Sequence, residues 1–173
     1  MRRYIVALVL LASLFAVAAR AGDFGLTDKA RWSVSASSAW LGIRENGVGW
    51  QGVDFASGLT FSVHQSLALT GNYAYGVPFD KSSGNRHITR LQGQLRLYPN
   101  LGQPAGKNGL FASAGPSWVD DWSGLNTQLA ATHSLSEHLA IFGMYSHGFA
   151  WDETSSDLDF YRVGLNAGIP FGR

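Results

Sequence analysis

A two-residue alternation of polar and apolar side chains constrains this chain most, and residues 86–98 show it most clearly. Leu91, Leu95 and Leu97 fall on one face of an extended strand. The opposite face carries Arg90, Gln92, Gln94 and Arg96. A strand of this composition needs an apolar environment on one side and a polar environment on the other. The pattern therefore predicts β structure whose two faces meet different surroundings.

The same alternation recurs along the chain, and no segment shows a helical period. The predicted strands are residues 31–41, 50–63, 66–75, 86–98, 110–118, 125–134, 139–149 and 159–171. Strands that cross a bilayer need about 9–11 residues, whereas strands of soluble sheets usually have about five or six. We therefore expect an all-β fold, an eight-stranded antiparallel up-and-down transmembrane β-barrel. Within it, Pro116 is expected to interrupt the ladder of its strand.

The N-terminus has the pattern of a secretory signal peptide. Arg2 and Arg3 precede an apolar run over residues 4–19, and Ala19-Arg20-Ala21 fits the small-x-small cleavage rule. The run is shorter than the about 20 residues that a membrane-spanning helix requires. We expect residues 1–21 to be the signal peptide and residues 22–173 to form a single barrel domain.

Composition excludes several classes of function. Charged residues make up 14% of the chain and aromatic residues 13%, whereas soluble domains carry about 25% charged residues. There is no cysteine, so neither a disulfide framework nor a thiolate metal site is possible. The net charge of +1 gives no case for nucleic-acid binding. The histidines lack the spacing of a metal site, and no cofactor is expected.

The last predicted strand, residues 159–171, places Tyr161, Val163, Leu165, Ile169 and Phe171 on one face. It resembles the C-terminal signature of bacterial outer-membrane β-barrels, in which a terminal aromatic residue closes an alternating strand. Residues 172 and 173 extend beyond that aromatic position.

Across residues 22–173 the pattern is similar to the transmembrane domain of outer-membrane protein A and to the outer-membrane protein X and attachment-invasion group. The resemblance implies a monomeric barrel in the outer membrane of a Gram-negative bacterium, with a role in envelope integrity, adhesion or host interaction and usually no catalysis. The implied partners are outer-membrane lipid, lipopolysaccharide and, through the C-terminal strand, the barrel-assembly machinery.

The even strand number places both termini on one side of the membrane, which we expect to be the periplasmic side. Short links between the second and third strands and between the sixth and seventh support this orientation, although the link over residues 99–109 is long for a periplasmic turn. Aromatic residues near strand ends predict two interfacial belts. The predicted belt residues are Trp32, Trp40, Trp118, Tyr73, Tyr75, Tyr145 and Phe171, and Trp50, Trp122 and Trp151 also lie at the ends assigned to the cell surface.

The lumen of an eight-stranded barrel is just wide enough for side chains to fill it, so a free diffusion pore is not expected. The predicted inward polar set is Asp54, Asn72, Arg90, Gln92, Gln94, Arg96, Asn126, Gln128, Arg162 and Asn166. Its three arginines face one firm acid, which leaves the lumen positive unless Asp159 or water joins the network. The set serves either as a network that stabilises the barrel or as a pathway for a small anion or solute. In residues 139–149 the pattern does not decide which face is inward.

Catalytic candidates are confined to His147, Asp157 and Asp159. A faintly similar arrangement occurs in the outer-membrane lipid A 3-O-deacylases, where a serine two residues after the histidine is the nucleophile. Here Phe149 occupies that position, and Ser146 points to the opposite face from His147. Because acyl transfer requires the nucleophile, no enzyme activity is expected. A lipid A acyl hydrolase and a secreted lipocalin-like barrel with an apolar interior remain as alternatives, and the polar face of residues 86–98 argues against the second.

Overall fold

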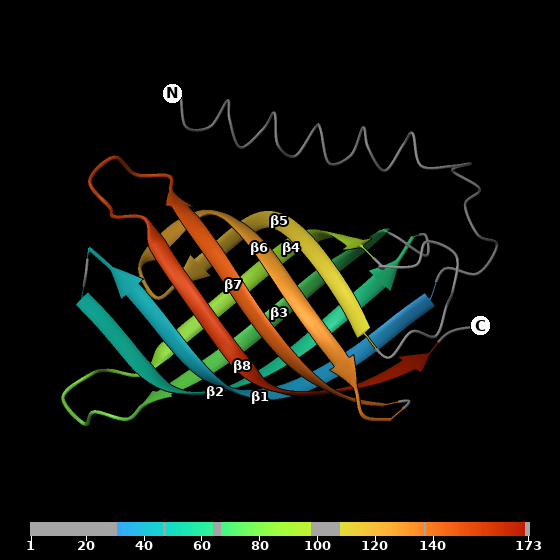
Figure 1. Cartoon of the computed structure of the whole chain (residues 1–173). Helices are drawn as coiled ribbons and strands as arrows, with labels where there is room; N and C mark the ends of the chain where they lie inside the picture. Colours follow the sequence, from blue (N-terminus) through green and yellow to red (C-terminus); the bar gives the residue numbers. More distant parts are fainter. Residues whose placement is uncertain (1–30, 47, 64–66, 98–107, 137, 172–173) are drawn as a thin grey trace.

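The computed structural model describes residues 31–46, 48–63, 67–97, 108–136 and 138–171. These residues form a closed antiparallel barrel in which each strand pairs with the next and the last pairs with the first (Figure 1). The strands are β1 (Arg31–Glu45), β2 (Val48–Ser62), β3 (Leu67–Pro78), β4 (Arg86–Leu97), β5 (Asn108–Val119), β6 (Trp122–Ser134), β7 (Leu139–Ala150) and β8 (Leu158–Phe171). The predicted eight-stranded barrel is therefore confirmed. The predicted signal peptide lies outside the described residues.

Each strand has 12 to 15 residues, more than most of the predicted segments. The seam between β1 and β8 runs from Trp32 opposite Phe171 to Glu45 opposite Leu158. As a result β1 begins and β8 ends at the same end of the barrel, at the right of Figure 1. We call this the terminal end and the opposite end the far end. No helix among the described residues is long and apolar enough to cross a membrane.

Two tight turns at the far end connect β1 to β2 and β5 to β6. Each contains a residue with positive φ, Asn46 at 46° and Asp120 at 50°. Asn and Asp are the side chains that tolerate this left-handed conformation best after glycine. The longer far-end loops are residues 79–85 and 151–157.

The ladder between β4 and β5 is broken at Pro116. Paired positions run to Arg90 opposite Ser117 and resume at Gly93 opposite Ala114. The two skipped positions of β4 face Pro116 and Gly115. Proline has no N–H, so it cannot donate to the neighbouring strand. The sequence predicted this interruption.

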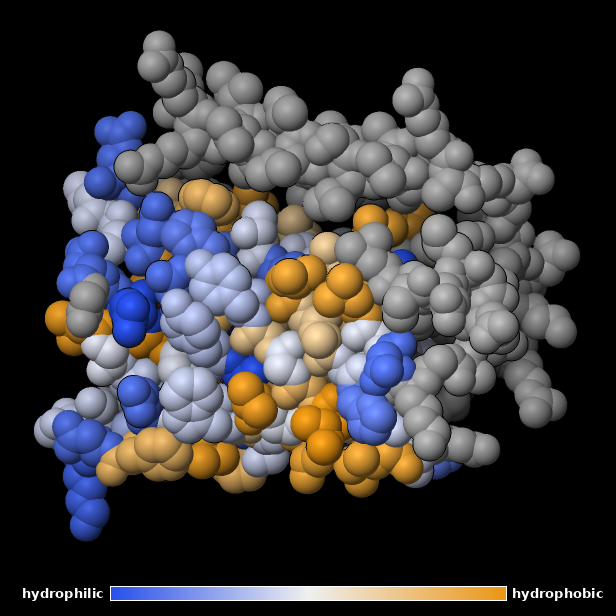
Figure 2. All heavy atoms as spheres, viewed as in Figure 1, coloured by the Kyte–Doolittle hydropathy of each residue, from blue (hydrophilic) through white to orange (hydrophobic). Residues whose placement is uncertain are grey.

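The outer surface carries an apolar band. Its exposed members include Val34, Phe55, Leu59, Leu69, Leu91, Leu129, Ile141, Val163, Leu165 and Ile169. In Figure 2 hydrophobic residues spread over the visible wall, and the most hydrophilic residues gather toward the far end, at the left. In β7, Phe142 and Met144 face the lumen, whereas Ile141, Tyr145 and His147 face outward. This settles the face that the sequence left open.

Candidate functional site

An apolar plug fills the far-end half of the lumen. It consists of Leu41, Ile43, Trp50, Ala74, Ile88, Val119, Leu158 and Phe160, with Ala56 and Trp122 packed against it. The indole N–H of Trp50 donates to the carbonyl of Gly84 at 2.9 Å, and that of Trp122 donates to the carbonyl of Ser156 at 2.9 Å. Two loops are thereby attached to the plug.

The plug corrects the prediction that all far-end tryptophans belong to an interfacial belt. Trp50 is 6% exposed and lies on the same face of β2 as the inward Asp54. Trp122 packs edge-on against the buried Phe160, with the ring planes at 70° and the ring centroids 6.5 Å apart. A buried indole is tolerated here because each N–H finds a loop carbonyl.

A charged layer lies beneath the plug. The guanidinium of Arg162 holds the carboxylate of Asp54 with two contacts, Nε to Oδ2 at 2.7 Å and Nη2 to Oδ1 at 2.9 Å. Both side chains are buried, and Nη2 of Arg162 also reaches Ser37 Oγ at 3.2 Å. Such two-point pairs are among the stronger interactions of an arginine.

A second polar group in the same lumen involves β4, β5 and β6. Gln92 donates to the side-chain oxygen of Asn126 at 2.9 Å and accepts from Ser113 at 3.4 Å. The sequence predicted Gln92 and Asn126 to point inward, and the structure brings them together. Ser113 was not predicted, because the small residues of β5 give no clear alternation.

Arg90 is the unbalanced cation of this layer. Its side chain is 2% exposed, its guanidinium carbon lies 4.9 Å from the centre of the Phe160 ring, and Nε and Nη2 have no hydrogen-bond partner among the described residues. Asp159 does not balance it, because Asp159 projects outward from β8, three positions before the inward Arg162. Alternation excludes an odd-numbered β8 residue from the lumen.

A cavity of about 360 Å³ occupies the terminal half of the lumen. Side chains therefore fill the far-end half, whereas in the terminal half they leave this space between them. The predicted residues Asn72, Gln94, Arg96, Gln128 and Asn166 all line this cavity. Arg96 extends Nη2 to Ser62 Oγ at 2.9 Å. The cavity exists because small side chains on β1 and β2 leave the interior of the barrel unfilled.

The outward face of β7 and β8 carries the histidine predicted as a catalytic candidate. Nδ1 of His147 lies 2.8 Å from Oδ1 of Asp159, and Nε2 lies 3.8 Å from Oδ2 of Asp157. The hydroxyl of Tyr145 also donates to Asp159 at 2.8 Å. Both imidazole nitrogens thus face carboxylates.

This cluster lacks a nucleophile among the described residues. Ser146 is fully buried on the lumen side, and Phe149 packs edge-on against His147 with centroids 4.5 Å apart. Thr127, directly opposite His147, donates its hydroxyl to the His147 carbonyl at 3.3 Å. The arrangement holds an imidazole in place but contains no Ser–His pair for acyl transfer.

The other predicted belt residues mostly face outward. Trp32, Trp40, Trp118, Tyr73 and Tyr145 are each between 39% and 45% exposed. Tyr75 is half-buried, with its ring centre 5.1 Å from that of His87. The backbone of Phe171 pairs with Trp32, and the side chain of Phe171 lies outside the description.

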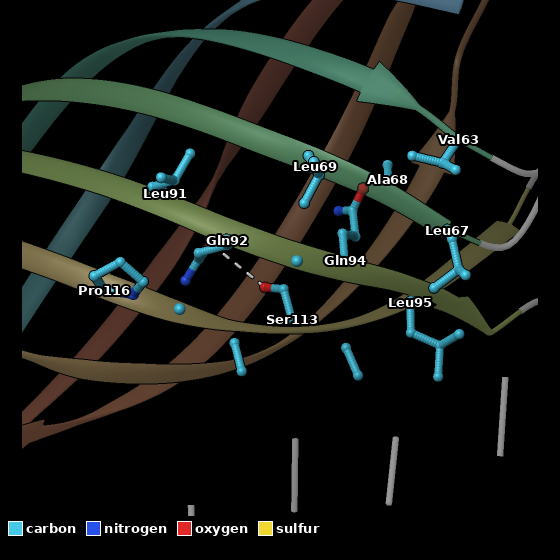
Figure 3. Close-up of a pocket in the computed structure, with 14 residues that line it drawn as sticks. Val63, Leu67, Ala68, Leu69, Leu91, Gln92, Gln94, Leu95, Ser113 and Pro116 are labelled. Carbon is cyan, nitrogen blue, oxygen red and sulfur yellow. Dashed lines mark hydrogen bonds between the residues drawn. The ribbon is translucent and has the colours of Figure 1, made fainter. Parts of the chain in front are cut away.

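An apolar groove of about 510 Å³ lies on the outer wall over β3, β4 and β5 (Figure 3). Its labelled residues include Leu67, Leu69, Leu91 and Leu95 on β3 and β4, and Pro116 on β5. It covers the place where the β4–β5 ladder is interrupted. With little polar surface of its own, the groove suits hydrocarbon and offers no chemistry.

No group of three His, Cys, Asp or Glu within the described strands and loops is arranged to hold a metal. No protein-family model matches the sequence, and no curated protein matches it either.

Solved structures do match. Neisserial surface protein A has a TM-score of 0.55 at 10% identity, over 81% of this chain and 97% of that one. The attachment invasion locus protein of Yersinia pestis has a TM-score of 0.52 at 12% identity, over 82% and 99%. The N-terminal barrel domain of OprF from Pseudomonas aeruginosa has a TM-score of 0.52 at 14% identity, over 78% and 96%. At these identities the likeness concerns architecture. The chain has the fold of the small eight-stranded outer-membrane β-barrels.

Proposed function

We propose that this protein is an integral barrel of the bacterial outer membrane that acts without catalysis, as a closed envelope barrel with an interaction surface at its far end. The observation that carries the proposal is the plug. Apolar side chains fill the far-end half of the lumen, while apolar side chains also cover the outside wall. A barrel of this kind can be held in lipid without opening a path for solutes.

The proposed orientation places the terminal end in the periplasm and the far end at the cell surface. The first strand, β1, begins at the terminal end and the last strand, β8, finishes there. Both chain ends of the barrel therefore lie on one side of the membrane, which fits insertion from the periplasm. The C-terminal strand β8 is then the contact for the barrel-assembly machinery, and outer-membrane lipid and lipopolysaccharide surround the wall. An epitope inserted in loop 79–85 should bind antibody on intact cells. Binding only after lysis contradicts this orientation.

The far end is acidic. Its acids are Glu45, Asp80, Asp120, Asp121, Asp152, Glu153, Asp157 and Asp159, and its cations are Arg44, Lys81 and Arg86. One of the cations is already paired, because Arg86 lies 2.9 Å from Asp120. The Yersinia pestis attachment protein has been solved with the heparin analogue sucrose octasulfate. The excess of carboxylates here repels such a polyanion, so we propose a cationic partner.

Conductance in planar bilayers tests the closed lumen. The purified protein should give no steady single-channel openings, and replacing Phe160 of the plug with alanine should produce them. Tyr161→Ala is the matched control, since Tyr161 is the next residue of the same strand and points outward. Steady openings of the unchanged protein contradict the proposal. Recovery in the soluble periplasm, without heat-modifiable gel mobility, contradicts the membrane location.

A lipid A acyl hydrolase is the second candidate, favoured by the 2.8 Å contact between His147 and Asp159. Because the cluster lacks a nucleophile, we expect the lipid A acyl pattern to be the same in cells with and without the protein. Loss of an acyl chain that depends on His147 in mass spectra of lipid A establishes the enzyme instead.

A further inference from the structure

The two halves of the lumen differ in how deeply their inward polar and apolar side chains are buried. In the far-end half, inward residues such as Leu41, Asp54, Ile88 and Phe160 are buried. In the terminal half, the inward side chains of Asn72, Gln94, Arg96, Gln128 and Asn166 are only partly buried and border the 360 Å³ cavity. The cavity runs from Arg162 in the charged layer to Ser33 and Gly168 near the terminal end. The plug closes it at the far end, which makes it a blind cavity.

The cavity wall is rich in groups that recognise hydroxyls. Seven residues with hydroxyl side chains line it, Ser33, Ser35, Ser37, Ser57, Thr60, Thr70 and Thr132. Four side-chain amides join them, and none of the four makes a side-chain hydrogen bond to another described residue. Each amide offers both donors and an acceptor. Phe111, Phe142 and Met144 supply an apolar side.

The charge of the lumen selects for an anion. Between the plug and the terminal end, Arg90, Arg96 and Arg162 face one described carboxylate, Asp54, which is engaged by Arg162. Arg96 lies in the cavity wall, with a neutral hydroxyl as its described partner. Cations within low-dielectric walls focus their potential on the enclosed space. The space is thus both positive and rich in hydrogen-bonding groups.

We propose that the terminal half of the lumen is a binding cavity for a small polyhydroxylated anion, of the sugar-acid or sugar-phosphate class. Its volume falls in the range of about 300–1,000 Å³ that is usual for small-molecule sites. Arg96 binds the anionic group, the amides and hydroxyls bind ring hydroxyls, and Phe111 and Phe142 contact the apolar face of the ring. The ligand enters and leaves at the terminal end, because the plug blocks passage.

Calorimetric titration of the detergent-solubilised barrel tests this proposal with D-glucuronate, D-glucose and inorganic phosphate as probes. Saturable binding of glucuronate is expected, with glucose and phosphate each weaker. Arg96→Gln should weaken glucuronate binding by about ten- to a hundredfold, the loss expected for a hydrogen bond to a charged group. Arg86→Gln is the matched control, because Arg86 lies on the same strand but at the far end, paired with Asp120. It should leave binding unchanged.

Asn166→Leu provides a second variant, which removes an amide from the cavity wall without altering charge, and it should also weaken binding. Heat-modifiable mobility identifies which variants are folded. The proposal is overturned if the folded unchanged protein gives no saturable binding, if Arg96→Gln binds as tightly, or if glucose matches glucuronate. Binding does not depend on the plug's being closed, so the conductance experiment and this titration can fail separately.

Discussion

Replacing Gly164 with alanine should weaken the seam that closes the barrel. Gly164 lies on β8 opposite Ala39 of β1. A Cβ at this position would be 2.2 Å from the carbonyl oxygen of Ser38 and 2.5 Å from the Cα of Ala39. Both contacts are with backbone, so no side-chain rotation can relieve them.

The size of the effect follows from the required movement. Contacts of a real Cβ essentially never fall below 3.0 Å, so β1 and β8 must separate locally by roughly 0.8 Å. Overpacking of this kind costs about 1–3 kcal/mol, which corresponds to an increase of about 5- to 150-fold in the unfolding equilibrium constant. β8 cannot move away from β1 freely, because β8 is also paired with β7.

Gly168→Ala is the matched control. Gly168 lies on the same strand, face and seam, but its added Cβ would be 3.7 Å from the nearest atom, the carbonyl oxygen of Val34. Urea unfolding in detergent, followed by tryptophan fluorescence, compares the two variants. A lowered midpoint is expected for Gly164→Ala only. Equal midpoints for both variants refute the steric reasoning, because they differ in the close approach alone.

Three further predictions concern the lumen and a far-end loop. Asp54→Asn should lower the free energy of unfolding by about 3–5 kcal/mol, because it leaves the buried Arg162 without its counter-ion. The double variant Asp54→Leu/Arg162→Met should recover much of this loss. If Asp54→Asn leaves the free energy of unfolding unchanged, the ion pair does not have this role. The backbone N–H and hydroxyl of Thr154 donate to Asp152 and hold the pKa of that carboxyl below its usual range. The resulting loop stability should be complete above the ordinary carboxyl pKa and be lost as pH falls through the lowered one. The measurement is the protection factor of the Thr154 amide, the intrinsic exchange rate divided by the observed rate at each pH, which should fall with pH and which Asp152→Asn should make independent of pH. Trp50→Phe should cost about 1 kcal/mol in urea unfolding, because it deletes one hydrogen bond to a loop carbonyl, whereas no change would show that the bond is dispensable.

The strands and most of their inward faces could be predicted from the sequence because alternation is strong wherever the two faces differ. On β4, Arg90 and Leu91 cannot exchange faces without burying leucine against polar groups and exposing arginine to hydrocarbon. The plug could not be found in this way. At the far end, residues such as Ile43 and Trp50 are apolar on the inward face too, so alternation disappears there.

In the candidate site, too, some features follow from local spacing and others depend on contacts between distant strands. Asp159 has the same parity as the outward Tyr161, so the spacing alone separates it from the lumen. The pairing of Arg162 with Asp54 leaves Arg90 without a paired carboxylate in the described part of the lumen. This arrangement depends on the register between distant strands, because Arg162 and Asp54 are 108 positions apart in the sequence. The cavity depends on the summed volumes of small side chains around the barrel, which no single segment reveals.

The two tryptophan bonds connect the surface of the barrel with its interior. Trp50 and Trp122 each anchor a different far-end loop, at Gly84 and at Ser156. A force that displaces either loop must therefore stretch a hydrogen bond whose donor is embedded in the plug. A displacement of either loop is thus transmitted to the plug through the indole that binds it. Both indoles are also intrinsic fluorophores, so they can report the seating of a partner on the acidic far end from inside the wall.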